Sequence, residues 1–383
     1  MGTRTSRVRV LGAYQSDLKD MLHSVAEVRA KIAEGKPLLL AGSEWALCQL
    51  QRGNWIGGTI PYFMDVTGGL CSESLVFVDE VPACATGFEI REYTVEQTLA
   101  SLSKDAPENG YSFLIVPGQS PVHAVYAQAA PSHPDSSLSP VVGWVSGVHI
   151  SRIEVERPKV FNGGSGEASS DRALVMHIAL PADKRAHLDI VNLFRPGPGD
   201  TITFPCSGFS AIECAVNGRP WKFPEYILRV RPDPQVPLVG EQSGRLVNVS
   251  IQGFDPMTRA IHFYAPVFPG VEYRFAEPVP DYIAAFDSAM SAHSDPAVFS
   301  CNCVLNYLYA ELEGKRTGTM TGLITFGEIA NQLLNQTLVR LLIRDVGHAS
   351  PRSRRSKKGS SSPHPDPSNR RRLSKNPAPR SKD

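Results

Sequence analysis

The chain has 383 residues, of which 42 % are hydrophobic and 20 % charged, and its net charge of +1 is close to neutral. This composition is typical of a folded protein with about two or three domains, and it excludes a fibrous chain, a coiled coil and a disulfide scaffold. Its apolar runs, such as 38–41, are far shorter than the roughly 18 residues of a membrane-spanning helix, which excludes an integral membrane protein.

A helical segment is expected over residues 1–36. Ser16 is a typical N-cap, and apolar residues recur at helical spacing from Leu18 to Ile32, before Gly35 ends the pattern. A second helix is expected after Thr94 and Gln97, which have the spacing of a capping box. Between them the predicted elements are a strand at 38–41, a short helix after Ser43, a glycine-broken strand at 55–60 and a strand at 75–78.

The same order of elements then recurs. It consists of a strand at 113–116, a helix at 121–130, a glycine-broken strand at 141–145, a glycine turn at 162–166 and a strand at 173–178. This recurrence predicts an α/β part over residues 37–200 that contains an internal duplication. The alternative is ordinary α/β alternation without duplication.

From residue 201 the pattern shifts towards β-structure, which predicts an α+β part over residues 201–346. Asn217-Gly218 is a hairpin signal, and a helix is expected at 281–290. The remaining predicted elements are strands at 211–216, 246–251, 260–264, 272–276, 298–301, 322–326 and 338–343, with a helix after 301 that ends at Gly314. The fold class expected for the whole chain is therefore α/β to α+β, with mixed β-sheets flanked by helices.

The last segment, residues 347–383, is predicted to be a disordered basic tail. It holds eleven Lys and Arg residues against two Asp, whereas the chain before it has 28 basic and 36 acidic residues. Ser, Pro, Arg and Lys dominate the segment, and it has no apolar periodicity with which to form a core. The charge predicts non-specific contact with anionic surfaces, and a solubilising terminus is the alternative.

The seven cysteines are an odd number, and they are scattered along the chain. No apolar segment follows the arginines of the first ten residues, so the start does not have the pattern of a secretory signal. A reduced, cytoplasmic location is expected.

No common motif of nucleotide, zinc or serine-hydrolase chemistry is present, and an enzyme is not expected. Cysteine hydrolysis by Cys301 or Cys71 is the minor alternative, and it needs a base beside the thiol. The interior strand glycines Gly57, Gly58 and Gly143 mark places where a ligand could approach the backbone. Glu328 and Asn335 follow buried strands, and they are candidates for lining a polar pocket, with solvated loops as the alternative.

The C-terminal part resembles the FIST domain family. The resemblance rests on a Ser-Cys strand end at 300–301, an aromatic-Gly-Glu-Ile strand at 326–329 and the Asn-containing segment 334–337. The hairpin 216–220 and the strand 55–59 are similar to further FIST segments, although Gly58 stands where the family usually has Cys. The family's usual Arg after Ser-Cys is also missing, since Asn302 follows Cys301.

This resemblance implies a two-part FIST-like architecture and a stand-alone sensory domain that binds an amino acid or a similar metabolite. It also implies a separate output partner, such as a kinase or cyclase, because the chain contains no room for one after residue 346. The expected ligand-binding residues are Gly57, Gly58, Thr59, Gly143, Trp144, Cys301, Gly327, Glu328 and Asn335. A haem-binding gas sensor is the alternative, with His149, His177 and His262 among the single histidines that could ligate iron.

Overall fold

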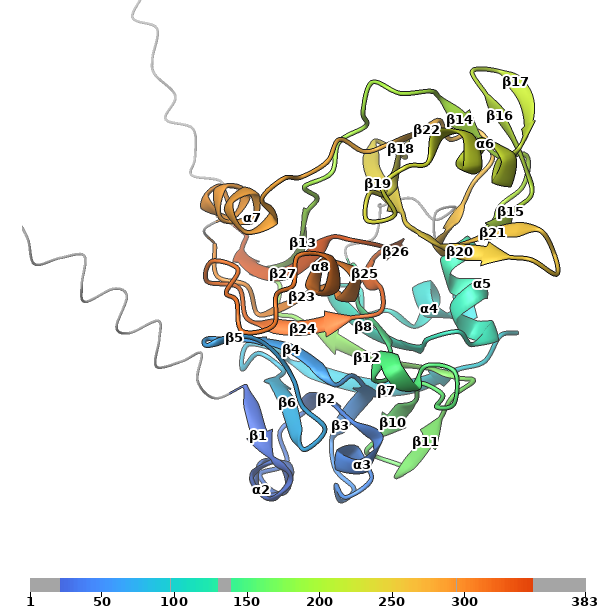
Figure 1. Ribbon diagram of the computed structural model, residues 1–383. Coiled ribbons are helices and arrows are strands. Elements are labelled where there is room, and N and C mark those ends of the chain that lie inside the picture. Colours follow the sequence, from blue (N-terminus) through green and yellow to red (C-terminus); the bar gives the residue numbers. More distant parts are fainter. Residues whose placement is uncertain (1–20, 97, 130–138, 294, 347–383) are drawn as a thin grey trace, which may run out of the picture. The chain divides into compact units, whose positions relative to one another are not determined.

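The computed structural model describes residues 21–96, 98–129, 139–293 and 295–346, and these belong to one compact unit (Figure 1). It is a mixed α/β structure with several mixed sheets and few helices, as the sequence predicted. The expected basic tail and the expected helix start at Ser16 lie outside the described residues. Among the described helices, none is both long enough and apolar enough to cross a membrane.

The first repeat of the fold spans residues 22–80. Its helices and strands are β1 (Leu22–Ser24), α2 (Val25–Ala33), β2 (Leu38–Gly42), α3 (Glu44–Leu47), β3 (Trp55–Thr59), β4 (Tyr62–Asp65), β5 (Gly68–Cys71) and β6 (Leu75–Glu80). Strands β2 and β3 are parallel and are joined through α3, and β6 pairs antiparallel with β2 on the other side.

The second repeat spans residues 87–179. Its elements are β7 (Gly87–Tyr93), α4 (Thr98–Asp105), β8 (Gly110–Pro117), α5 (Pro121–Ala129), β9 (Val141–Ser146), the 3-10 turn η3 (Ile150–Arg152), β10 (Val160–Asn162), β11 (Glu167–Ser169) and β12 (Ala173–Ala179). Here β8 and β9 are the parallel pair, and β12 pairs antiparallel with β8.

A third repeat follows at residues 184–345. Its elements are β13 (Lys184–Val191), α7 (Tyr282–Ser291), β23 (Phe299–Cys303), α8 (Val304–Tyr309), β24 (Gly322–Thr325), β25 (Glu328–Ala330), β26 (Leu333–Leu334) and β27 (Leu338–Asp345). Strands β23 and β24 are parallel, and β27 pairs antiparallel with β23. The alternation noticed at 38–180 is thus part of a topology that occurs three times.

Each repeat gives one hairpin to the sheet of another repeat. The strand orders are β1-β6-β2-β3-β10-β11, β7-β12-β8-β9-β25-β26 and β13-β27-β23-β24-β4-β5. Repeat 2 therefore completes the sheet of repeat 1, repeat 3 completes that of repeat 2, and repeat 1 completes that of repeat 3. Two of these sheets contain strands from both sequence-predicted parts, 37–200 and 201–346.

The two faces of each sheet have different roles, because alternate side chains of a strand point to opposite faces. Leu38 and Leu40 pack in a cluster that includes Val28 of α2, whereas Leu39 and Ala41 face a large common core. Phe113 and Ile115 of β8 and Phe299 and Cys301 of β23 enter the same common core. The inner faces of the three sheets therefore share one core.

A separate β-structure is inserted between β13 and α7. Its elements are β14 (Ile202–Thr203), β15 (Gly208–Ala211), β16 (Glu213–Val216), β17 (Arg219–Lys222), α6 (Phe223–Val230), β18 (Leu238–Gln242), β19 (Arg245–Val249), β20 (Ile251–Asp255), β21 (Ala260–Val267) and β22 (Tyr273–Phe275). These strands form a six-stranded and a three-stranded sheet (Figure 1). They enclose their own cluster of buried aliphatic and aromatic side chains.

The first described helix begins later than the sequence predicted. Residues Leu22–Ser24 form strand β1 and pair with β6, so the predicted helix is wrong at its N-terminal end. The reason is a capping box at Ser24, whose side chain accepts the backbone N–H of Glu27 while the Glu27 carboxylate accepts the N–H of Ser24. The Thr94–Gln97 capping box cannot be compared, since residue 97 lies outside the described residues.

Candidate functional site

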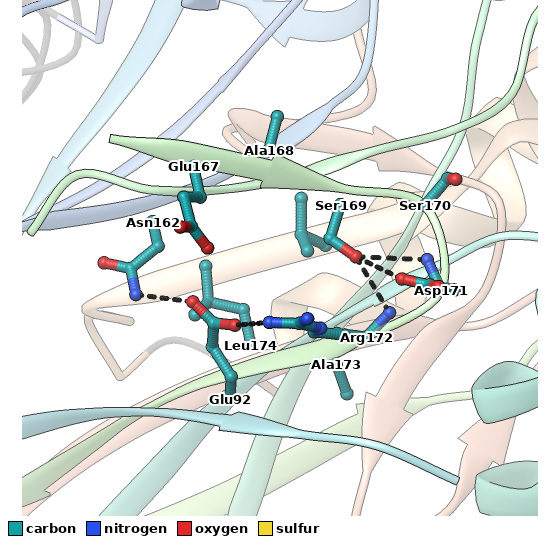
Figure 2. Close-up of a pocket in the computed structure, with 11 residues that line it drawn as sticks. Glu92, Asn162, Glu167, Ala168, Ser169, Ser170, Asp171, Arg172, Ala173 and Leu174 are labelled. Carbon is teal, nitrogen blue, oxygen red and sulfur yellow. Dashed lines mark hydrogen bonds and ion pairs between the residues drawn. The ribbon is translucent and has the colours of Figure 1, made fainter. Parts of the chain in front are cut away.

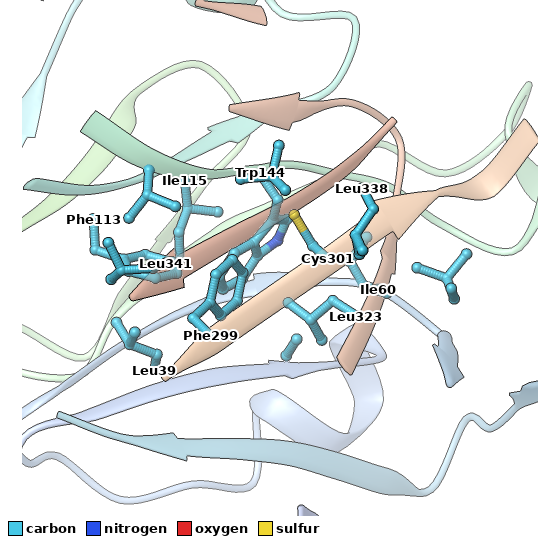
Figure 3. Close-up of a cluster of buried hydrophobic side chains, with 14 of the residues drawn as sticks. Leu39, Ile60, Phe113, Ile115, Trp144, Phe299, Cys301, Leu323, Leu338 and Leu341 are labelled. Carbon is cyan, nitrogen blue, oxygen red and sulfur yellow. The ribbon is translucent and has the colours of Figure 1, made fainter. Parts of the chain in front are cut away.

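Four of the sequence-predicted site residues, Gly58, Gly143, Trp144 and Cys301, meet in the common core rather than in an open pocket. Figure 3 shows Trp144 and Cys301 side by side among Ile115, Phe299 and other apolar side chains. The Cys301 thiol lies 3.7 Å from the backbone oxygen of Gly143. A Cβ atom placed on Gly58 would lie 2.7 Å from Ile115 Cγ2 and 3.0 Å from Trp144 Nε1. Glycine is therefore required at position 58 by the close packing of the sheets.

Two other predicted residues lie apart from this group. A Cβ on Gly57 would meet Leu40 and Trp55 on the helix-covered face, opposite to the common core. Thr59 lies at the end of β3, where its backbone N–H and hydroxyl both donate to the backbone oxygen of Lys159. Among the described residues, no hydrogen bond joins either of them to Gly327, Glu328 or Asn335.

Glu328 is the central group of the C-terminal candidates. It is fully buried, and its carboxylate accepts hydrogen bonds from Thr325 Oγ1 at 3.3 Å and from the backbone N–H and hydroxyl of Thr337 at 3.1 and 2.9 Å. Burial raises the pKa of Glu328 from 4.5 to about 8, although these hydrogen bonds oppose the rise. The carboxyl group is therefore mainly protonated at neutral pH.

Asn335 connects this buried group to the inserted β-structure. Its Nδ2 donates to Cys303 Sγ at 3.6 Å, and its Oδ1 accepts the backbone N–H of Ser250 at 3.0 Å. Gln336 continues the connection, since its Oε1 accepts the Ser250 hydroxyl and its Nε2 donates to the Gln235 backbone oxygen at 3.3 Å. Gly327 has no side chain, but its backbone oxygen accepts the N–H of Val145 in β9. Through these hydrogen bonds, Asn335 and Gln336 connect repeat 3 to the inserted β-structure, and Gly327 connects it to repeat 2.

A pocket of about 400 Å³ opens in front of this connection, and we name it the Asn306 pocket. From the inserted β-structure and its flanks, the pocket is lined by Phe194, Asp233, Gln235 and Val236. From repeat 3, it is lined by residues 278–283, by Asn306, Tyr309, Ala310, Glu311 and Lys315, and by Gln336. Ligand pockets commonly occur at such junctions between substructures. The predicted residues Glu328 and Asn335 do not line this pocket, whereas their neighbour Gln336 does.

Asn306 carries the unusual feature of this pocket. Its residue is 2 % exposed, and its Oδ1 atom has no hydrogen-bond donor in the described part of the chain. The orientation of the amide follows from its neighbours. Asn302 Oδ1 accepts the backbone N–H of Cys303, so it is an oxygen, and Asn306 must present its NH₂ group to it at 2.9 Å. Asn306 Oδ1 is thus a buried acceptor whose partner is missing.

The sequence does distinguish Asn306 as a buried polar residue, although Asn306 was not among the predicted site residues. It is the one amide in the otherwise apolar and aromatic segment of α8, Val304–Tyr309. A polar side chain on a buried helical turn requires a partner, since an unpaired buried polar group costs about 1–3 kcal/mol. Tyr282 was also missed. It lines the pocket, and its hydroxyl accepts Asn302 Nδ2 at 3.2 Å.

Two other pockets have walls whose polar groups are paired with each other. Figure 2 shows one of about 370 Å³, in which Glu92 bonds both Asn162 and Arg172. The other, of about 290 Å³, contains Thr59, and in it Arg152 pairs with Glu73 and Glu156. The polar groups of these two walls are hydrogen-bonded or ion-paired with each other. Neither wall contains, among its described residues, a buried polar atom without a partner like Asn306 Oδ1.

His177, one of the histidines expected to ligate a haem iron, has hydrogen bonds at both ring nitrogens. His177 Nδ1 lies 2.8 Å from Ser112 Oγ, and its Nε2 lies 2.8 Å from the hydroxyl of Tyr93, which donates to Asp105 at 2.9 Å. Burial lowers the pKa of His177, which keeps the ring neutral. Two further single histidines, His149 and His262, lie beside Ser151 and Asp255.

The cysteines show no arrangement for nucleophilic catalysis. Burial raises the pKa of the Cys301 thiol well above 9 and that of Cys71 to about 11, which disfavours the reactive thiolate. No histidine in the described part of the chain hydrogen-bonds to either thiol. All seven cysteines are free, and no three metal-ligating side chains come together in the described residues.

Comparisons with known proteins give a family but no activity. No curated protein matches the sequence. One family model, described as a family of unknown function, DUF6976, matches residues 23–344. That match carries no link to FIST domains, so the FIST resemblance stays a prediction. The match begins in β1 and ends in β27, and it covers all three repeats and the inserted β-structure. The chain therefore belongs to the DUF6976 family.

Proposed function

We propose that this protein is a binding protein for a small ligand and that the Asn306 pocket is its binding site. The observation that carries the proposal is that Asn306, which lines the pocket, has a buried Oδ1 without a donor in the described residues; a ligand that enters the pocket and displaces its wall at Asn306 would supply the missing hydrogen bond. The pocket volume of about 400 Å³ lies in the range of roughly 300–1,000 Å³ that is usual for small-molecule sites.

A sensory role extends this proposal. The pocket lies between repeat 3 and the inserted β-structure, and the Asn335–Gln336 connection reaches both of them. A ligand that tightens this junction would change the position of the inserted β-structure, which a separate output protein could recognise. We place this activity in the cytoplasm, because seven unpaired cysteines suit a reducing compartment.

The test compares ligand binding by the wild type and by Asn306→Leu. Both proteins are screened by thermal denaturation against the twenty amino acids, short organic acids, short amines and haem. A ligand present at about 100 times its dissociation constant adds roughly 2.7 kcal/mol to the free energy of unfolding, so true binding shifts the melting temperature. We expect at least one compound to stabilise the wild type and not Asn306→Leu.

The matched control is Asn162→Leu, the same substitution in the pocket of Figure 2. It should leave the ligand-induced shift unchanged. Asp233→Asn, at the exposed mouth of the Asn306 pocket, provides a second variant that does not depend on repacking the core. A stabilising compound whose effect is equal in the wild type and in both pocket variants would place the binding site elsewhere and overturn the proposal.

A further inference from the structure

We propose that the ligand of the Asn306 pocket is a small organic cation, whose ammonium group donates hydrogen bonds to Asn306 Oδ1, and that it carries no carboxylate. This inference rests on the proposed function and specifies the chemistry of the same site. It differs from the amino-acid ligand that the FIST resemblance implies.

One acceptor of the wall, Asn306 Oδ1, requires a donor. Asn306 Oδ1 is fixed as an acceptor by the Asn302 network, and it is more than nine-tenths buried. The amide of Gln336 does not compensate, because its Nε2 is already bound to the backbone oxygen of Gln235 and its Oε1 to Ser250. A ligand with an N–H group therefore satisfies Asn306 Oδ1, which a ligand that only accepts hydrogen bonds does not.

The negative charge of the pocket favours a cationic donor over a neutral one. Three carboxylates line it, Asp233, Asp281 and Glu311, against a single ammonium group, Lys315, which lies 3.6 Å from Glu311. Asp281 Oδ1 caps α7 by accepting the N–H of Ala284, and Asp233 Oδ1 accepts the N–H of Gln235. The second oxygen of each carboxylate has no other partner within the described residues. A ligand carboxylate would be repelled here.

The remaining wall accommodates an organic body rather than a metal ion. Tyr309 and Tyr282 add aromatic surface, and Phe194, Val236 and Ile283 add apolar surface. An ammonium group is attracted to the faces of aromatic rings, and its methylene groups pack against apolar side chains. In the described part of the chain no three metal-ligating side chains are grouped together, which disfavours a bare metal ion.

The experiment uses compounds that share a carbon skeleton but differ in their end groups. Isothermal titration of the full chain is carried out with butane-1,4-diamine, 4-aminobutyrate, succinate and butane-1,4-diol, and with the corresponding series of about two to six carbons. We expect the diamines to bind most tightly, the amino acids more weakly, and the diacids and diols not at all. Binding should weaken as salt is added, because screening reduces the attraction between exposed charges.

Two variants connect the binding to the named residues. Asn306→Leu and the double variant Asp233→Asn, Asp281→Asn should each weaken diamine binding by roughly tenfold or more, a change that corresponds to the loss of one good charged hydrogen bond. Asparagine is also a good N-cap, so the double variant retains the start of α7. Asp171→Asn, in the pocket of Figure 2, is the matched control and should bind the diamine as the wild type does.

The outcomes separate the two proposals. If a diacid or diol binds better than the diamine, and Asn306→Leu abolishes that binding, the small-ligand function stands and the cationic class is wrong. If no compound of the series binds, the cationic class is wrong, and the wider thermal screen decides whether the pocket binds another ligand. If Asn306→Leu and the double variant bind the diamine like the wild type, both the ligand class and the Asn306 pocket as a binding site are wrong.

Discussion

Replacing Glu328 with glutamine should change how the free energy of unfolding depends on pH. In the folded chain burial raises the pKa of Glu328 from 4.5 to about 8, so the folded state holds a proton that the unfolded state has lost. Unfolding therefore releases a proton between these two pH values. The contribution of Glu328 to the free energy of unfolding is therefore highest below pH 4.5 and decreases as the pH rises to about 8.

The size of this effect follows from the two pKa values. Each pH unit between them is worth about 1.4 kcal/mol, so the Glu328 contribution to the free energy of unfolding falls by roughly 5 kcal/mol across the range. Glutamine has a similar shape and does not titrate. Glu328→Gln should therefore resemble the wild type near pH 5, apart from a constant offset, and should be relatively more stable by several kcal/mol at pH 8.5.

Urea-induced unfolding, followed by tryptophan fluorescence at pH 5, 6, 7 and 8.5, measures this difference. Asp79 provides the matched control, because burial also raises its pKa to about 8 and a nearby Glu80 adds to the rise. Asp79→Asn should remove its own share of the pH dependence and leave that of Glu328 intact. Parallel curves for the wild type and Glu328→Gln would show that Glu328 is already ionised in the folded protein, and the argument from burial would fail.

Two further predictions concern the fold. Gly143→Ala should lower the free energy of unfolding by at least about 3 kcal/mol, because the new Cβ would lie 1.8 Å from the backbone oxygen of Leu114 at a φ of +155°. Gly87→Ala is its control in another strand, since a Cβ there meets nothing within 4 Å; equal losses in the two urea titrations would contradict the prediction. Removal of residues 350–383 should leave the unfolding midpoint and diamine binding unchanged, because the last strand of the three sheets ends at Asp345. A truncated chain without a cooperative unfolding transition would show that the tail belongs to the fold.

Local patterns in the sequence predicted most of the repeated elements but not the way they assemble. The glycine-broken strands at 55–60 and 141–145 were predicted correctly as strands, since periodicity and turn residues are local signals. The third repeat was not recognised, because the inserted β-structure separates β13 from α7 and β23. The exchange of hairpins between repeats is a long-range pairing, and short-range periodicity contains no information about it.

The candidate site likewise depends partly on local sequence patterns and partly on long-range contacts. Glu328 and Asn335 are both buried and hydrogen-bonded, Glu328 to Thr337 and Asn335 to Cys303, but neither lines the Asn306 pocket. Their burial could not be predicted, because it depends on Ser250 of the inserted β-structure and on the core contacts of repeat 3. The importance of Asn306 depends on the direction of one amide group, which is determined by Asn302 and the backbone of Cys303.

The cyclic exchange of hairpins has a consequence for how the chain folds during synthesis. Met64 in β4 pairs with Gly322 in β24, so the hairpin β4–β5 cannot reach its final sheet until most of the chain has been made. Until then, its strands and the open edge of β9 have unpaired backbone groups, which are typical starting points for aggregation. Contacts between such distant residues also slow folding, because the chain loses the entropy of closing a long loop before strand pairing stabilises the contact. A chain released before repeat 3 is complete would therefore carry two unsatisfied edges, and chaperone binding during translation would protect this protein more than one built from independent repeats.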